Sequence, residues 1–394
     1  MAQPDRTNVS VNGDKDASDR KKIKLDNCRE GILLGYGNPL LDIQVNGTVE
    51  FLKKYDLKPN DAILAEEKHK PMFKDMVDTF KDVEYIPGGA TQNAIKVAQW
   101  SSCYEARPSA AGKWPFKRRI MQWIIGIPKA TTFFGCISKD KFGKILEEKA
   151  REAGVNVKYQ YTDKEGTGTC GVVVTADNRS LCANLGAANC FTEDHLDDPE
   201  NWNLVEKAEF FYIAGFPLTV CPPAILRIAK HACENNKVFC MNLSAPFLCQ
   251  FYKEPMLQVL PYVDILFGNE SEAEAFAKEN NFNTTDRKEI AQKITEWKKE
   301  NKSRKRTVVI TQGEDPTIVA ADGKVEEYPV IAINQKDIVD CNGAGDAFVG
   351  GFLAQLVARK SIAECIRCGH YAANVIIKRS GCTFPEKPSF VPYE

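Results

Sequence analysis

Four short apolar runs, each followed by a helical pattern, constrain the fold of this chain more than any other feature. Such runs are typical of strands that are buried on both faces of a sheet. The runs occupy residues 210–215, 238–243, 264–268 and 307–311, and the helical patterns occupy residues 222–235, 246–260, 271–280 and 344–359. This alternation predicts an α/β fold with a mostly parallel central sheet and helices on both of its faces.

The composition narrows the classes of function. With 52 Lys and Arg against 53 Asp and Glu, the formal net charge is −1, which provides no overall basic field for nucleic acid. No apolar run reaches the roughly 18 residues of a membrane span, so we expect a soluble intracellular protein. The 14 cysteines lie among apolar runs, as small buried side chains do. Cys365 and Cys368 form a Cys-x-x-Cys pair, but without a second pair at zinc spacing they favour packing over metal.

A glycine-rich turn that opens a helix is the first candidate for chemistry. Residues 340–346 read Asp-Cys-Asn-Gly-Ala-Gly-Asp. Gly343 and Gly345 let the backbone adopt positive φ and approach a ligand closely, and the N–H groups at a helix start attract an anion. Asp346, in the first helical turn, is placed to accept a proton beside that anion. The alternative is an ordinary helix N-terminus with a capping Asn or Asp.

Polar residues near the amino end form a second candidate. Asn38 and Asp42 follow a predicted first central strand at its carboxyl end, where open α/β sheets bind ligands. The glycine spacing there does not fit a dinucleotide fingerprint, because the third glycine is missing. Gly88 and Gly89 form another turn that opens a helix, and Asn93 lies one turn inside it. Two such turns are less easily explained by chance than one.

Carboxamide and carboxylate side chains follow several predicted strands, and the ends of parallel strands share one edge of a sheet. Asn269 and Glu272, three residues apart at a helix start, suit Mg²⁺ held mainly through water. An N-cap with its capping-box residue explains the same two letters. Phosphoryl transfer requires an anion cradle, Mg²⁺, a base and a cation on the moving charge. Arg179, on a predicted hairpin, is a candidate for that cation.

Two stretches resemble the signatures of the ribokinase-like (PfkB) sugar kinase family, namely Gly88-Gly89 opening a helix and the glycine-rich run that ends at Asp346. The Asn-x-x-Glu at 269–272 resembles the magnesium motif of that family. Longer strings resemble its adenosine-phosphorylating branch, at residues 37–42, 168–170, 177–180, 242–247, 268–270, 369–375 and 381–386. The resemblance runs from about residue 30 to the end. It implies a three-layer ribokinase-like fold with a small β-sheet lid, formed near residues 41–58, 83–87 and 159–190.

The resemblance also implies a reaction, the ATP-dependent phosphorylation of adenosine on its 5′-hydroxyl, with Mg²⁺ as cofactor. The protein would be a monomer without nucleic-acid or membrane partners. The general base would be Asp346, Arg179 would close with the lid, and the anion hole would be the turn of Asn342, Gly343, Ala344 and Gly345. The nucleoside pocket would be formed by Asn38, Asp42, Gly88, Gly89, Asn93, Cys170, Leu181, Phe216 and Gln335. The ATP site would be bordered by Asn269, Thr311, Gly313, His370 and Asn374, with Asn269 and Glu272 at the metal.

Two alternatives stay open beside this reaction. One is a kinase of the same family for another nucleoside or a sugar. The other is a non-catalytic nucleotide-binding protein, if an insertion at residues 101–123 blocks closure of the lid.

The chain departs from the family pattern in four places. Ala90, Cys341 and Pro217 stand where the family usually has Ser, Thr and a second aromatic residue. Residues 101–123 are inserted where the family runs directly from a helix to a strand. We expect this insertion to be looped out and disordered, so that its deletion leaves or improves activity and stability.

Two basic segments are open to a simple interpretation as solvated charge. Residues 1–29 are polar and expected to be disordered. Within them the cluster from Arg20 to Lys24 is either a solvated run or a nuclear-import signal, which would place the protein in nucleus and cytoplasm with an import receptor as partner. Residues 298–306 are expected to be a solvated helix end.

Overall fold

The structure is a computed structural model, and it describes residues 29–391 apart from 60–61, 102–128 and 176–177. The side chains at positions 62, 178 and 179 also lie outside the description. The predicted tail with its basic cluster, and the predicted insertion beyond Ser101, therefore lie outside the described residues. Within the described residues, none of the helices has the length and apolar character needed to cross a membrane.

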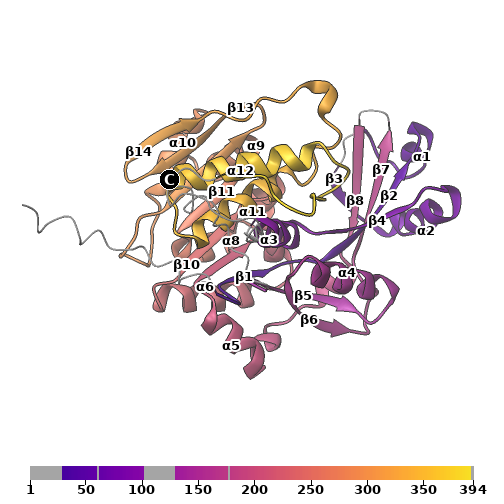
Figure 1. Ribbon diagram of the computed structural model, residues 1–394, viewed down its shortest axis with the longest axis horizontal. Coiled ribbons are helices and arrows are strands. Elements are labelled where there is room, and N and C mark those ends of the chain that lie inside the picture. The colour runs from indigo at the N-terminus through magenta and orange to yellow at the C-terminus, as the bar shows by residue number, and fades with distance from the viewer. Residues whose placement is uncertain (1–28, 60–61, 102–128, 176–177, 392–394) are drawn as a thin grey trace, which may run out of the picture.

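A large sheet forms the centre of the molecule (Figure 1). In its described part, neighbouring strands are parallel except at one edge, where β13 is antiparallel to both β12 and β14. In order across the sheet the strands are β14 (Lys324–Tyr328), β13 (Asp315–Ala321), β12 (Thr307–Gln312), β11 (Ile265–Asn269), β10 (Val238–Asn242), β9 (Phe210–Ile213), β1 (Leu33–Tyr36), β5 (Thr131–Ser138) and β6 (Asn156–Thr162). The prediction of a mostly parallel central sheet is confirmed.

Helices cover both faces of this sheet. Alternate residues of one strand therefore point into two different hydrophobic cores. In β9, Phe210 and Tyr212 belong to one hydrophobic core, whereas Phe211 and Ile213 belong to the other. The first core is closed by α3 (Ala90–Ser101), α4 (Lys141–Glu152), α11 (Ala344–Val357) and α12 (Ile362–Ile377). The second is closed by α5 (Pro199–Lys207), α6 (Pro222–Glu234), α7 (Pro246–Phe251), α8 (Lys253–Val259), α9 (Glu270–Glu279) and α10 (Arg287–Thr295). This is the three-layer arrangement that was expected.

A second, smaller sheet lies at one end of the large one (Figure 1). Its strands, in order, are β3 (Ala62–Leu64), β8 (Asn178–Asn184), β7 (Thr169–Thr175), β2 (Leu40–Asn46) and β4 (Glu84–Gly88). Helices α1 (Val49–Lys54) and α2 (Lys70–Thr79) pack on it through a separate core that includes Phe51, Met72 and Val173. Strand β3 lies outside the ranges predicted for a lid, and residues 159–162 belong to β6 of the large sheet instead.

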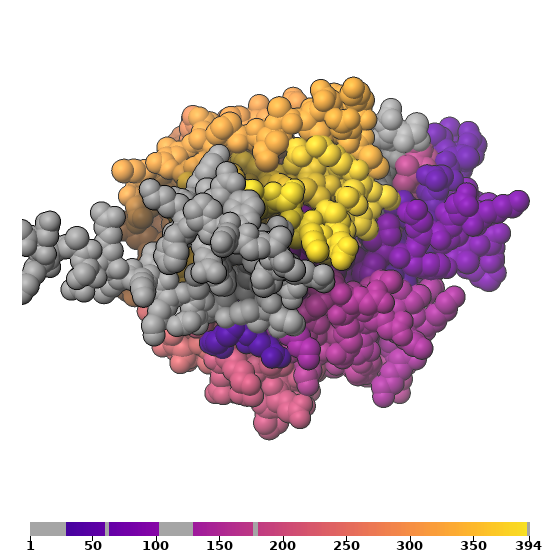
Figure 2. Space-filling model, viewed as in Figure 1, coloured from indigo at the N-terminus to yellow at the C-terminus, as the bar shows by residue number. Residues whose placement is uncertain are grey.

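The C-terminal segment connects the two sheets. The amide Nε2 of Gln44 in β2 donates to Glu84 Oε2 at 2.9 Å and to Ser380 Oγ at 2.7 Å. Figure 2 shows the C-terminal residues (yellow) lying directly against the small-sheet segments (purple). The small sheet is therefore tied to the body at a point distant in sequence.

Two local expectations were wrong. The predicted helix over 246–260 is divided at Tyr252 into α7 and α8. Pro255 explains the break, because it lacks an N–H and its ring conflicts with the carbonyl four residues earlier. The basic run at 298–306 is not simply solvated, since the side chains of Lys299 and Arg306 are buried.

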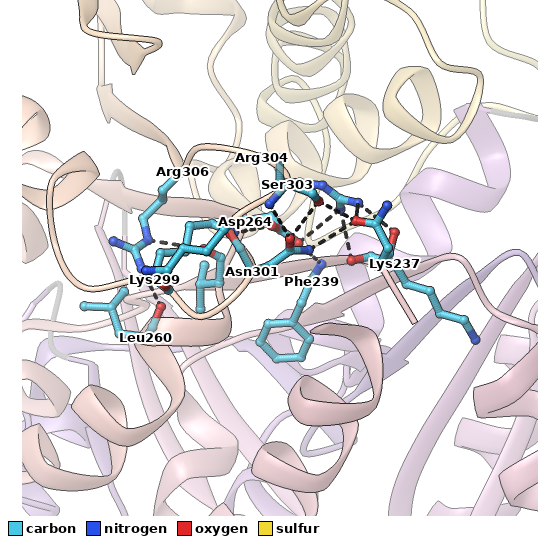
Figure 3. A network of polar contacts seen from close by, with 12 residues as sticks. Lys237, Phe239, Leu260, Asp264, Lys299, Asn301, Ser303, Arg304 and Arg306 are labelled. Carbon is cyan, nitrogen blue, oxygen red and sulfur yellow. Dashed lines mark hydrogen bonds and ion pairs between the residues drawn. The ribbon is translucent and has the colours of Figure 1, made fainter. Parts of the chain in front are cut away.

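Arg306 and its neighbours form what we call the amino-edge cluster, made of Asp264, Lys299, Arg304 and Arg306 (Figure 3). Asp264 and Arg306 immediately precede β11 and β12, so the cluster lies at the amino ends of the parallel strands. Arg306 is 1% exposed and donates to five backbone carbonyls, those of Leu260, Val263, Ile294, Trp297 and Lys298. Burial lowers the pKa of Arg306 to about 10. The cluster joins the ends of helices and strands and faces away from the opposite, carboxyl edge.

Candidate active site

The carboxyl edge of the large sheet gathers polar residues that follow its strands. Asn38 follows β1, Asn269 ends β11 and Thr311 lies near the end of β12. Because these strands are parallel, their ends share one edge, as predicted from the sequence. Asn38 is 7% exposed, yet neither its Oδ1 nor its Nδ2 has a hydrogen-bond partner in the part of the chain that the structure describes. A buried amide left unpaired is costly, so this side chain indicates a place for a bound polar group.

The two glycines at residues 88 and 89 are required by what lies against them. A Cβ at Gly88 would lie 2.4 Å from Asp42 Oδ1, and one at Gly89 would lie 2.3 Å from the carbonyl oxygen of Asn38. Gly89 also has φ +93, in the left-handed region. Asp42 pairs across the small sheet with Cys170 of β7. The structure thus brings Asn38, Asp42, Cys170 and the glycine turn to one place.

Asp346 lies in the first turn of α11, and Gly343, with φ 76, is the N-cap residue of that helix. Asn93 Nδ2, on α3, donates to Asp346 Oδ2 at 3.0 Å. Burial raises the pKa of Asp346 to about 7, against the hydrogen bond from Asn93 and the positive charge of Lys96. A carboxyl group with a pKa near neutrality is suited to accept a proton at physiological pH.

The N–H groups of the turn before α11 are not all available to an anion. The N–H of Asn342 donates to Asp340 Oδ1 at 2.9 Å, and that of Ala344 donates to the carbonyl of Cys341 at 3.2 Å. Within the described residues, the N–H groups of this turn that are left to bind an anion are those of Gly343 and Gly345. A Cβ at Gly345 would meet no atom within 4 Å, and its φ is not positive. The sequence argument for backbone freedom therefore holds at Gly343 only.

Asn269 and Glu272 form the capping box of α9, as the structural alternative held. Asn269 Oδ1 accepts from Glu272 N at 2.9 Å, and Asn269 N donates to Glu272 Oε2 at 3.0 Å. Burial raises the pKa of Glu272 to about 7. Over the described residues no cluster of three or more His, Cys, Asp or Glu could hold a metal directly. The side-chain oxygens of Asn269 and Glu272 fit Mg²⁺ held through water, since Mg²⁺ keeps several waters and binds few carboxylates.

The residues predicted for ATP differ in their surroundings. Gly313, with φ +60, has open space where a Cβ would lie, and Thr311 Oγ1 donates to the carbonyl of Gly268 at 3.5 Å. His370 is buried, its Nε2 lies 2.8 Å from Thr317 Oγ1, and burial lowers its pKa to about 4. It is a neutral imidazole that joins α12 to β13. Asn374 lies one turn further along α12 and is partly exposed.

The other predicted residues are less closely connected. Leu181 lies in β8 opposite Val172. Phe216 is half-buried, with its ring centroid 6.3 Å from that of Phe247. Gln335 is exposed in the short turn Gln335–Asp337. Arg179 takes part in β8, but its side chain lies outside the description, so its role stays a prediction.

Sequence reasoning missed two residues of this site. Lys96 is 5% exposed, and its Nζ donates to the carbonyl of Pro87 at 2.7 Å. Asp340 accepts from the backbone N–H of Asn342 and, at 2.8 Å, from that of Gly381. Lys96 stands three residues after Asn93 and hence on the same helix face, a spacing that could have identified it.

The chain is similar to known proteins in sequence and in fold. The model of the pfkB family carbohydrate kinases matches residues 49–389. The chain is similar to adenosine kinase 2 of Arabidopsis thaliana, with 54% identity over 92% of this chain and 98% of that one. It resembles the crystal structure of Anopheles gambiae adenosine kinase in complex with P1,P4-di(adenosine-5) tetraphosphate, with TM-score 0.82, 48% identity and coverage of 92% and 100%. It also resembles Schistosoma mansoni adenosine kinase in complex with adenosine and AMP, with TM-score 0.79, 35% identity and coverage of 92% and 99%.

Proposed function

The chain belongs to the pfkB family of carbohydrate kinases, and we propose that it transfers the γ-phosphoryl group of ATP to the 5′-hydroxyl of adenosine, giving AMP and ADP. The relatives named above are adenosine kinases, and their similarity extends over nearly the whole length of this chain. The observation that carries the proposal is the Asn93–Asp346 pair beside the Gly88-Gly89 turn. The pair supports a role for Asp346 as proton acceptor, because it lies at the N-terminus of α11 and close to the glycine turn.

In this proposal Asp346 accepts the proton of the 5′-hydroxyl as that oxygen attacks the γ-phosphorus. Its pKa, raised by burial to about 7, matches this task. The N–H groups of Gly343 and Gly345 hold the phosphoryl oxygens at the positive end of α11. Arg179 approaches with the small sheet and neutralises the transferred charge. The proton acceptor and the anion site thus lie within one helical turn.

The nucleoside is held by residues around the Gly88-Gly89 turn. Asp42, with its carboxylate against Gly88, accepts hydrogen bonds from the ribose hydroxyls. The buried side-chain amide of Asn38 forms hydrogen bonds with the nucleoside base. The unpaired amide supports a polar ligand at this place, and the adenosine kinase relatives favour a nucleoside there.

Mg²⁺ fits beside Asn269 and Glu272, which would hold it through water, and it supplies neutralisation of the phosphate charge. ATP lies toward Gly313, where the structure leaves open space. Burial raises the pKa of Glu272, and a nearby cation would favour its charged form.

The test is ADP formation by the full chain with adenosine, guanosine, inosine or ribose as acceptor. We expect adenosine to be strongly preferred. Preference for another acceptor would support a different nucleoside or sugar kinase. Nucleotide binding with no turnover would support a non-catalytic binding protein.

We also propose that the protein is a monomer. We further propose that it is present in both nucleus and cytoplasm, with residues 20–24 as its nuclear-import signal. Sedimentation would test the first statement. A fluorescent fusion with these five residues replaced by alanine should lose nuclear signal, and unchanged distribution would contradict the second.

A further inference from the structure

Lys96 is a buried cation that the proposed reaction does not use. It lies on α3, three residues after Asn93, and its Nζ donates to the carbonyl of Pro87, the residue before the Gly88-Gly89 turn. Among the described residues, that carbonyl is its hydrogen-bond acceptor. Burial lowers the pKa of Lys96, whereas interaction with Cys382, Asp42 and Asp346 favours its charged form.

One face of α3 holds the end of β4 through two side chains. Gln92 Nε2 donates to the carbonyl of Gly88 at 3.1 Å, and Lys96, one helical turn later, donates to the preceding carbonyl. Either residue would fix the glycine turn, but only Lys96 brings a positive charge. A neutral side chain would hold a carbonyl without the desolvation cost of burying an ammonium group. The charge therefore points to a role beyond holding the strand.

We propose that Lys96 is a positioning residue for phosphoryl transfer, which fixes the glycine turn and supplies the positive charge shared by Asp42 and Asp346. This inference rests on the proposed function. The charge opposes the effect of burial on the pKa of Asp346 and so favours the deprotonated form that accepts a proton. It also allows two carboxylates to lie close together in one site.

Groups on several elements act on Asp346. Those that favour its charged form are Asn93, by a hydrogen bond, and Lys96, by its charge. Asp42 of β2 and Glu272 of α9 oppose ionisation. Cys382 of the C-terminal segment and Tyr212 of β9 also interact electrostatically with Asp346. Among these side chains Lys96 is the cation, so its replacement by a neutral residue should raise the pKa of Asp346.

The experiment compares wild type, Lys96→Gln, Lys96→Met and the control Gln92→Met by kcat/KM for adenosine between pH 6 and pH 9. Lys96→Gln removes the charge and keeps an N–H donor for the Pro87 carbonyl on a slightly shorter side chain. We expect both Lys96 variants to lose about tenfold or more in kcat/KM at pH 6.5 and to recover part of this by pH 9, since one pKa unit is a factor of ten. Gln92→Met should change KM without moving the pH profile.

A second readout does not need turnover. The infrared band of a protonated carboxylic acid that disappears in Asp346→Asn should be stronger in Lys96→Gln than in wild type at pH 7. Inactive wild type would refute the proposed function, while the infrared comparison would still decide the role of Lys96. A pH-independent loss in Lys96→Gln, or an unchanged carboxyl band, would overturn the inference. If Lys96→Met does not fold, Lys96→Gln alone decides.

Discussion

The two edges of the large sheet bury polar and charged groups in opposite ways. In the amino-edge cluster every charge has partners: Asp264 accepts from Lys299 at 2.7 Å and from the backbone N–H of Phe239 at 2.9 Å, and Arg306 donates to five carbonyls. At the carboxyl edge the partners are incomplete. Both polar atoms of the Asn38 side chain and Oδ1 of Asn93 have none within the described part of the chain.

This difference separates a structural network from a binding site. A buried polar group whose hydrogen bonds are all made stabilises the fold it joins. One whose bonds are not made lowers stability until a ligand supplies them. The same comparison predicts that substitutions at one edge change stability and that substitutions at the other change chemistry.

The largest effect is expected for Asp346→Asn. Because an amide cannot accept the proton, kcat should fall by about 10²–10⁴-fold, while adenosine binding largely survives. Steady-state kinetics and calorimetry of binding provide the measurement, with Asp322→Asn, on an exposed turn, as the control. Equal rates in wild type and Asp346→Asn would remove this carboxylate from the mechanism.

Arg306→Met should show the reverse behaviour at the other edge. Five backbone carbonyls would lose their donor, so the free energy of unfolding should fall by about 3 kcal/mol or more, with kcat of the folded enzyme little changed. Urea unfolding measures the loss. The neighbouring Lys305→Met is the matched control, because Lys305 is exposed, and it should cost no more than about 0.5 kcal/mol. Similar effects of the two substitutions would break the comparison.

Asn38→Leu tests the incomplete partners directly. Removal of an unpaired amide should leave the free energy of unfolding unchanged or slightly higher, whereas the affinity for adenosine should fall by about 1–2 kcal/mol, or roughly 5–30-fold in Kd. Calorimetric titration and thermal unfolding report the two quantities separately. A loss of stability without a change in Kd would mean that Asn38 belongs with the structural network.

The sequence predicted more of the large sheet than of the charges around it. Continuous apolar strands can be recognised because burial on both faces leaves few polar letters, and a shared edge then follows from parallel order. The fate of a Lys or Arg cannot be recognised in that way. Arg306 is buried, yet its neighbours in sequence gave no sign of it, because it donates to the carbonyls of Ile294 and Leu260 in other segments. For Lys96 the available sign was its spacing of three residues from Asn93.

The glycine turn shows the same limit within the candidate site. Its letters predicted an anion site of four residues. The structure uses the N–H of Asn342 and that of Ala344 inside the turn, since Asp340 and the Cys341 carbonyl accept them. The hydrogen bond from Gly381 to Asp340 joins segments 41 residues apart, and no local pattern encodes it.

The smallest expected effect is on the pH dependence of stability. Burial raises the pKa of Asp346 to about 7 in the folded protein, so the folded state binds this proton more tightly than the unfolded state. The contribution of Asp346 to stability is therefore greatest at low pH and is lost as pH rises through about 7. Asp346→Asn has no carboxyl group at this position and does not lose stability in this way. The Tm of the variant minus that of wild type should therefore rise between pH 5.5 and pH 8.5. A change of about 1 °C corresponds to 1 kcal/mol in a chain of this size, because the entropy of unfolding grows with chain length. A constant difference in Tm would mean that the folded state binds the proton of Asp346 no more tightly than the unfolded state does, and the two edges would then differ less than their hydrogen bonds indicate.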